Sequence, residues 1–224
     1  ANADLSGTNM ERADVQRANL AGADLSGADL SSADFSGAWL SSACLSDTTV
    51  REAIFKRARM PRLQMLDAVI NSSNFREAIA QSASFHQARF YDTDWSAGDV
   101  GAAQFYHCRM QHCRFTGTVA TGASFTGAKL DHCDFAKGEL DDVKFTRAEL
   151  VQCSFRDATL RRADFREARI RGGEFNRAVL DGARFAGAQL LSSDFRGANL
   201  RGARDLTQEQ LMQALTDSGT ILPN

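Results

Sequence analysis

The chain has 224 residues, 43% of them apolar, and a formal net charge of -2. This composition, with only two prolines, suits one folded domain, and the charge excludes a strong general attraction to nucleic acid or to an anionic membrane. No apolar run approaches the roughly 18 to 20 residues that cross a bilayer, so no membrane contact is expected. The cysteine count, five, is odd and favours reduced thiols in a cytoplasm, although secretion without a signal peptide stays open.

A repeat of five residues dominates the chain. From Leu5 to Leu200 every fifth residue is a repeat centre, and 38 of these 40 centres are large and apolar, the exceptions being Ala80 and Ala120. All fifteen phenylalanines fall on this series, and a small residue usually stands two positions before each centre. Neither a helix nor a strand keeps a five-residue step on one face. We therefore predict a chain that bends at every repeat and closes into stacked coils.

The repeat units resemble those of a known family. Units such as ADLSG (residues 23–27), ADFSG (33–37) and ANLRG (198–202) resemble the pentapeptide repeats of bacterial proteins. That resemblance implies an all-β fold, a right-handed quadrilateral β-helix with four pentapeptides per coil and about ten coils over residues 1–204.

Two features of the chain agree with a four-sided coil. The centres alternate between Phe and Leu from Phe125 to Leu200, with one Ile, as expected for an even number of sides. Residues 20 apart should then lie above one another, and the last four residues of one such column alternate in charge. They are Asp141, Arg161, Asp181 and Arg201.

The two ends of the repeat differ. The repeat is already in register at Ala3, so we expect the first coil to be covered by an upstream domain or by end-to-end pairing with a second copy. Residues 205–224 are predicted to form a helical cap and tail on the last coil. Within them Thr207 and Gln210 match a capping box, and an apolar helix face is expected from Leu211, Met212 and Leu215.

The repeat is least regular at residues 61–66. Pro61 lies at a surface position, Leu63 replaces a small residue, and Leu66 lies outside, so we predict a bulge or a bent coil there. A local basic run flanks this stretch and contains Arg51, Lys56, Arg57, Arg59 and Arg62. The pattern fits a solvated, distorted coil, and it also fits a partner surface.

A second irregular region covers residues 80–120. Ala80, Val100 and Ala120 thin one inward column, and Trp95 is expected to fill the space. On the outside, aromatic and basic residues stack near each other and form a candidate partner surface. Its residues are His86, Arg89, Tyr91, Tyr106, Arg109 and Lys129. Exposed aromatic groups also fill gaps between coils, which is the alternative interpretation.

The stretch HCRMQHC (residues 107–113) suggests a zinc site, but the repeat argues against it. Cys108, Cys113, Cys133 and Cys153 occupy inward positions, whereas the neighbouring histidines point outward, so the two sets cannot share one tetrahedral metal. Only a surface pair, His112 and His132, could catch a metal ion. No cofactor and no catalytic constellation are expected.

Two functions compete. The first is a non-catalytic scaffold that binds a protein partner, as the C-terminal repeat domain of a larger bacterial protein such as a secretion-system adaptor or effector. The second follows from the family resemblance, which implies DNA-shaped proteins that inhibit or protect type II topoisomerases. That mimicry needs a strongly negative rod, and a belt of arginines opposes it: Arg156, Arg161, Arg162, Arg166, Arg169 and Arg171. Residues 1–50, with seven acids and two bases, could still serve it.

Overall fold

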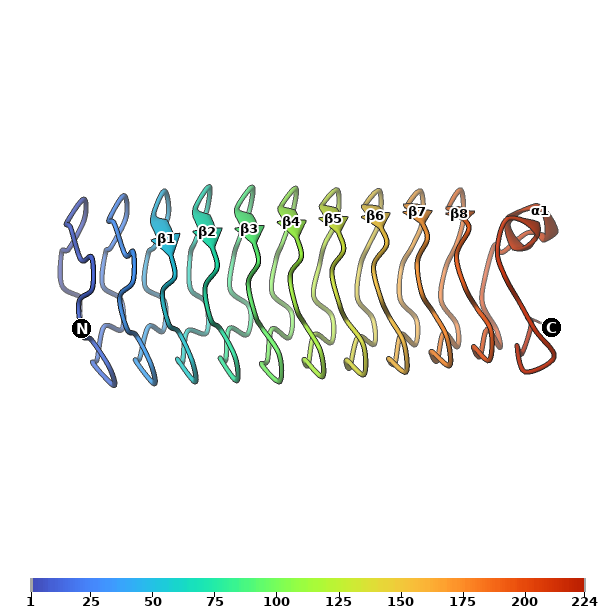
Figure 1. Cartoon of the computed structure of the whole chain (residues 1–224), viewed down its shortest axis with the longest axis horizontal. Helices are drawn as coiled ribbons and strands as arrows, with labels where there is room; N and C mark the ends of the chain where they lie inside the picture. The colour runs from blue at the N-terminus through green and yellow to red at the C-terminus, as the bar shows by residue number, and fades with distance from the viewer. Residues whose placement is uncertain (1, 224) are drawn as a thin grey trace.

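The computed structural model describes residues 2–223 and shows a rod of stacked coils (Figure 1). Residues 20 apart in sequence pair in parallel, from the bridge between Asp4 and Asp24 to the bridge between Arg184 and Arg204. The fold is the expected right-handed, four-sided β-helix. Each repeat contributes one side of a coil, because its centre and the small residue before it point inward while the other residues face solvent.

One face of the rod, which we name the strand face, carries the regular strands. They are β1 (Thr49–Arg51), β2 (Val69–Asn71), β3 (Arg89–Tyr91), β4 (Arg109–Gln111), β5 (Lys129–Asp131), β6 (Glu149–Val151), β7 (Arg169–Arg171) and β8 (Gln189–Leu191). They form one parallel sheet in the order β1 to β8. The eight strands span seven turns, fewer than the ten coils expected, and isolated bridges extend the same register to both ends.

A tight turn forms each corner of the coil. At a representative corner the Ala163 N–H donates to the Leu160 carbonyl at 3.1 Å, and Arg162 has φ 55°, as in a type II turn. Glycine adopts this conformation freely at Gly182 (φ 70°), whereas a residue with a side chain pays roughly 1 kcal/mol. The same positive φ recurs every five residues, so the ladder imposes the turn even where glycine is absent.

Stacked rings fill the interior of the rod. Phe165 and Phe185, one coil apart, lie parallel with their ring centroids 5.3 Å apart. A neighbouring column of phenylalanines meets this column edge-on, as between Phe165 and Phe175 at 5.7 Å. Parallel stacking within a column and edge contacts between columns are both favourable ring geometries. The alternation of Phe and Leu therefore produces two aromatic columns on opposite sides of the coil, which meet in its centre, and two aliphatic columns on the other sides.

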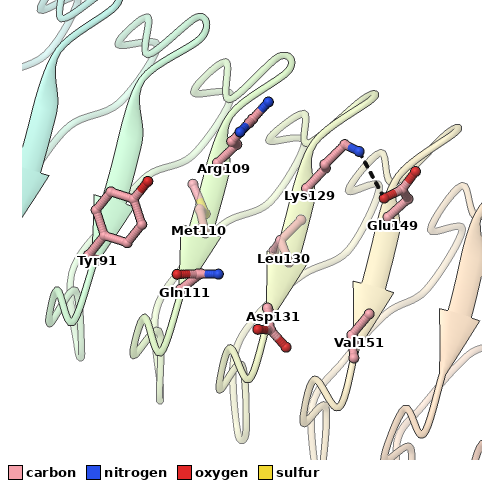
Figure 2. A pocket seen from close by; sticks show the side chains of 9 residues that line it. All are labelled: Tyr91, Arg109, Met110, Gln111, Lys129, Leu130, Asp131, Glu149 and Val151. Atoms are coloured by element: carbon pink, nitrogen blue, oxygen red, sulfur yellow. Dashed lines mark ion pairs between the residues drawn. The ribbon is translucent and has the colours of Figure 1, made fainter.

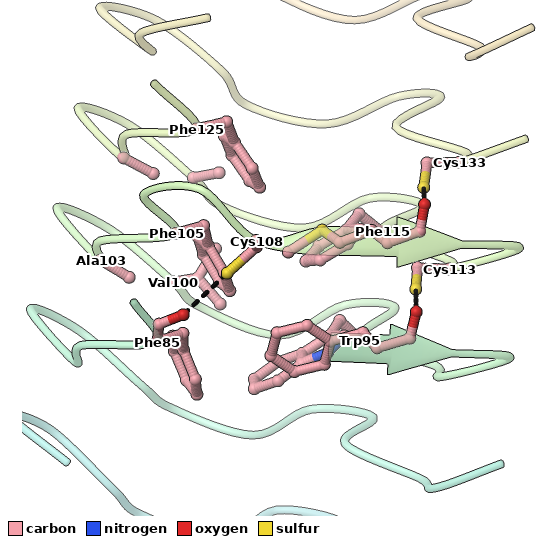
Figure 3. Packing of buried hydrophobic residues seen from close by; sticks show 14 of the residues in the cluster. Phe85, Trp95, Val100, Ala103, Phe105, Cys108, Cys113, Phe115, Phe125 and Cys133 are labelled. Carbon is pink, nitrogen blue, oxygen red and sulfur yellow. Dashed lines mark hydrogen bonds between the residues drawn. The ribbon is translucent and has the colours of Figure 1, made fainter. Parts of the chain in front are cut away.

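Trp95 belongs to one of these columns and is fully buried (Figure 3). Its indole stacks on Phe75, with ring centroids 4.2 Å apart, and lies 6.1 Å from Phe115. The adjacent inward column holds Val100 between two alanines, so the large indole adds volume where the neighbouring centres are small.

The coil at residues 61–66 is regular, and the predicted bulge at Pro61, Leu63 and Leu66 is wrong. Gln64, in the middle of this stretch, forms parallel bridges to the coils on both sides. Leu63 is buried although it replaces a small residue. The centres before and after it are methionines, whose unbranched side chains adapt to irregular space. The extra volume is thus accommodated inside the coil and does not bend the backbone.

A short helix, α1 (Gln208–Met212), follows the last coil (Figure 1). Thr207 precedes it, and its hydroxyl accepts from the Gln210 N–H at 3.2 Å while its own N–H donates to Gln210 Oε1 at 2.7 Å. Gln210 is buried and its Nε2 donates to the carbonyls of Phe185 and Ala188, each at 2.8 Å. Within residues 2–223 no helix has the length and apolar character to cross a bilayer.

The apolar helix face predicted for this end is wrong for two of its three residues. Leu211 packs partly buried against the core, but Met212 is 74% exposed and Leu215 is 56% exposed. The physical reason is that the helix ends early and the chain returns to the ladder. Leu215 bridges Asp194 and therefore occupies an outward position, and Ile221 forms a similar bridge on the next side. These bridges give backbone partners to the last coil.

Candidate partner-binding surface

The six residues predicted as a partner surface lie on the strand face and at the corner that precedes it. His86 and Tyr106 lie above one another in the turns of that corner, with ring centroids 4.7 Å apart and planes inclined by 44°. Nδ1 of His86 lies 2.7 Å from the Ser84 hydroxyl, which orients the ring. The other four belong to strands β3, β4 and β5 of the strand face: Arg89, Tyr91, Arg109 and Lys129.

Three cations occupy the first position of three neighbouring strands. Arg89 pairs in register with Arg109, and Arg109 pairs with Lys129. The Lys129 ammonium lies 3.2 Å from a Glu149 carboxylate oxygen, whereas Arg89 and Arg109 have no carboxylate partner within residues 2–223. Like charges opposite each other in a sheet are destabilising. The strand face therefore presents two adjacent guanidinium groups whose charge the fold does not neutralise.

A shallow hollow of about 330 Å³ lies beside these cations (Figure 2). Tyr91, Arg109 and Lys129 line it together with residues that sequence reasoning missed, above all Gln111 and Asp131. The missed residues stand directly after the inward centres of β4 and β5, in the same column as Tyr91. The regular 20-residue spacing would have identified them. Arg89 lies outside the hollow itself, in register with Arg109 on the preceding strand. We name the group Arg89, Tyr91, Arg109 and Lys129 the cationic hollow.

The strand face continues beyond this hollow as a mixed apolar and basic strip. Val151 and Leu191 are 38% and 50% exposed, and Arg171 lies between them in the same column. These three residues line a second hollow over β6, β7 and β8. Sequence reasoning did not select this strip, because an apolar residue one position after a centre is unremarkable in a single repeat.

The belt of arginines near the C-terminal end is largely neutralised, which corrects its interpretation as a basic surface. Five of its six members have a carboxylate partner: Arg156–Glu174 at 2.9 Å, Arg161–Asp141 at 3.5 Å, Arg162–Asp142 at 2.6 Å, Arg166–Asp164 at 2.6 Å and Arg169–Glu149 at 3.5 Å. The hydrogen bond from Arg162 lowers the pKa of Asp142 below its ordinary value. Within residues 2–223 only Arg171 of this belt has no such ion pair. The belt therefore opposes DNA mimicry less than its composition suggests.

The cysteines and histidines of the HCRMQHC region point in opposite directions. Cys108, Cys113, Cys133 and Cys153 are buried thiols, and Figure 3 labels the first three of them in the core. Burial is the main cause that raises the pKa of Cys113 above its ordinary value, so its thiol stays protonated. His112 and His132 lie outside, with ring centroids 5.2 Å apart. The two sets cannot form one mixed metal site.

Comparison with known proteins agrees with the geometry of the coils. Models of pentapeptide repeats match residues 8–47, 18–57 and 139–199, and a model of a pentapeptide repeat region matches residues 88–165. The chain belongs to the pentapeptide-repeat family. A search of curated proteins finds no match.

Solved pentapeptide-repeat structures resemble this one. HetL, a protein involved in heterocyst differentiation regulation in the cyanobacterium Nostoc sp. strain PCC 7120, is 22% identical, with a TM-score of 0.74 over 87% of this chain and 89% of HetL. A trypsin-treated variant of QnrB1, a plasmid-mediated fluoroquinolone resistance protein, is 19% identical over 100% of this chain and 92% of that one, with a TM-score of 0.40. At these identities the likeness to HetL supports the fold alone.

Proposed function

We propose that this pentapeptide-repeat protein is a non-catalytic scaffold that binds a protein partner at the cationic hollow. The observation that carries the proposal is the register of Arg89 and Arg109, which places two guanidinium groups on neighbouring strands without a carboxylate partner within residues 2–223. Within residues 2–223, 12 of the 22 arginines have a carboxylate partner, whereas Arg89 and Arg109 are unpaired and lie in register beside Tyr91. Folding stability favours neutralisation of adjacent like charges, so two guanidinium groups left unpaired side by side support a role in binding.

The two unpaired guanidinium groups suit an acidic partner segment, while Lys129 is offset by Glu149, and Asp131 also lines the hollow. Guanidinium groups bind carboxylates through two parallel hydrogen bonds, and Arg and Tyr are the residue types that most often dominate binding energy at protein interfaces. Tyr91 supplies an aromatic face beside the cations. The interior supports a non-catalytic role, because stacked side chains fill it from coil to coil.

Charge reversal tests this proposal. The variant Arg89→Glu, Arg109→Glu should lose the partners that the parent chain retains in a quantitative pull-down, because its hollow would repel a carboxylate. The matched control is Arg12→Glu, Arg17→Glu, which changes the net charge equally at exposed corner positions with positive φ. Glutamate already occupies this conformation at Glu77. Equal partner loss in both variants, or in neither, would exclude the cationic hollow as the binding surface.

Topoisomerase protection is a second candidate function, and one observation favours it. The paired arginine belt leaves the C-terminal part of the rod closer to neutral than expected, while residues 1–50 remain acidic. A supercoiling assay with purified gyrase tests this candidate. A chain that neither inhibits supercoiling nor protects gyrase from a quinolone would remove it.

A further inference from the structure

Two histidines lie above one another at a single corner of the rod. His112 and His132 each stand two positions after an inward centre, at φ 53° and 51°. The ladder holds them in place, because the His112 N–H donates to the Asp131 carbonyl at 2.9 Å. Their ring centroids are 5.2 Å apart and their planes are inclined by 37°. The His132 side chain is 48% exposed, so the pair is open to solvent.

This separation matches two ligands of one metal ion. Imidazole nitrogens bind Zn²⁺ at about 2.0 to 2.1 Å in tetrahedral geometry, which places the centres of two coordinating rings roughly 5 Å apart. The backbone already imposes that separation, so the two rings need only rotate about their side-chain bonds. A preformed arrangement lowers the entropic cost of chelation.

A carboxylate orients one of the two rings. Oδ1 of Asp131 lies 2.8 Å from Nδ1 of His132, and because the carboxylate can only accept, Nδ1 carries the proton. Nε2 of His132 is thereby left as the free lone pair. Histidines that bind metals usually donate their second ring nitrogen to such a carboxylate, which orients the ring and raises its basicity. This hydrogen bond is an observation independent of the spacing of the rings.

We propose that His112 and His132 bind a divalent transition-metal ion, with Asp131 as the positioning residue for His132. Neutral imidazoles favour ions such as Zn²⁺, Ni²⁺ and Cu²⁺ over Mg²⁺ and Ca²⁺. Within residues 2–223 no group of three or more His, Cys, Asp or Glu side chains has the geometry to hold a metal, so the site has two protein ligands and open positions. Water fills the remaining coordination positions of the bound ion when no other ligand is present.

The site is distinct from the cationic hollow but adjoins it. Asp131 lines the hollow, and its carboxylate also forms the hydrogen bond with Nδ1 of His132 at the corner. The metal proposal does not rest on the proposed function, because its ligands are outside the group Arg89, Tyr91, Arg109 and Lys129. The two proposals therefore have separate tests.

Calorimetric titration with Zn²⁺ tests the site in the full chain. Cys44 is the only cysteine that is not buried, so Cys44→Ser is the parent background for all variants. His112→Asn and His132→Asn remove one ligand each, and asparagine tolerates the positive φ of both positions. The control His86→Asn, His107→Asn removes the other two histidines of the chain.

We expect one zinc ion per parent chain, an unchanged affinity in the control, and at least a tenfold loss in each ligand variant. Asp131→Asn should weaken binding by about 10-fold to 100-fold, as is typical when an outer partner of a metal ligand is removed. Circular dichroism verifies that each variant keeps the coil. An unchanged affinity in His112→Asn and His132→Asn, or an equal loss in the control, would overturn the proposal. An unchanged affinity in Asp131→Asn would overturn its positioning role.

Discussion

Gln210 links the C-terminal helix to the last coils, and its removal should open that end of the rod. In Gln210→Ala the carbonyls of Phe185 and Ala188 lose the Nε2 donor, which lies 2.8 Å from each, and Thr207 loses its reciprocal hydrogen bond. A buried acceptor left without a donor costs about 1 to 3 kcal/mol. Water that enters beside the smaller side chain offsets part of this cost. We therefore expect the local opening free energy to fall by about 2 to 4 kcal/mol.

Hydrogen exchange measured by mass spectrometry is the appropriate assay, because contacts in a solenoid connect neighbouring repeats and the loss should remain local. Amides of residues 205–221 should exchange roughly 30-fold to 1000-fold faster, which is the same free energy expressed as a rate ratio. Amides of the central coils should be unchanged. The control Gln208→Ala changes an exposed position of the same helix. Exchange that rises equally in both variants, or in neither, would refute this reasoning.

Three further predictions concern the core, the surface charges and the thiols. Trp95→Ala removes a fully buried indole and should lower the free energy of unfolding in urea by about 3 to 5 kcal/mol; a loss below 1 kcal/mol would contradict the packing described here. The Arg162 hydrogen bond lowers the pKa of Asp142 in the folded chain. The contribution of this bond to the free energy of unfolding is therefore fully present above the ordinary pKa of an aspartate and is lost as pH falls through the lowered value. Asp142→Asn should thus lower the melting temperature slightly at pH 7, which corresponds to a free energy of unfolding smaller by at most about 1 kcal/mol. The difference should shrink as the pH falls below the ordinary pKa of an aspartate. Iodoacetamide should modify Cys44 and leave Cys113 and the other buried thiols unmodified in the native chain, with all five modified in denaturant, as mass spectrometry would show.

The fold was predictable because every repeat reports the same physical constraint. An apolar centre every fifth residue cannot be buried by a helix or a flat strand, so the coil follows from the spacing alone. Together with the four-sided coil that the family resemblance implies, this spacing correctly predicted that Arg89, Arg109 and Lys129 would stack, because residues 20 apart are opposite each other in the ladder. For a residue whose backbone pairs in this ladder, the residues on the coils above and below are therefore those 20 positions away in the sequence.

The errors arose where side-chain packing or the end of the ladder decides the outcome. Leu63 violates the repeat, yet it is buried without a bulge beside two adaptable methionines. At the C-terminus Leu215 suits the apolar face of a helix, but the open edge of the last coil recruits its backbone and turns its side chain outward. A periodic sequence pattern does not show how much free volume the interior of a coil has. It also does not show which segment pairs with the backbone of the last coil.

The repeat also predicts some ion pairs of the surface and not others. Arg161 pairs with Asp141 across 20 residues as the repeat predicts, but Arg156 pairs across 18 residues and Arg166 pairs within its own repeat. Long arginine side chains reach several carboxylates from one backbone position, and rotamer choice selects among them. The spacing of charges could not distinguish a basic belt from a neutral one.

The sequence by itself determined that the chain bends at every repeat and which way nearly every side chain points, because a helix or strand cannot bury a five-residue period repeated 40 times. The resemblance of its units to pentapeptide repeats supplied the four-sided coil and its 20-residue register. The tertiary structure alone decided which outward charges remain unpaired, how the last coil is covered, and that Asp131 orients His132. These properties depend on side-chain conformations and on the geometry of two or three neighbouring coils, which no single repeat contains.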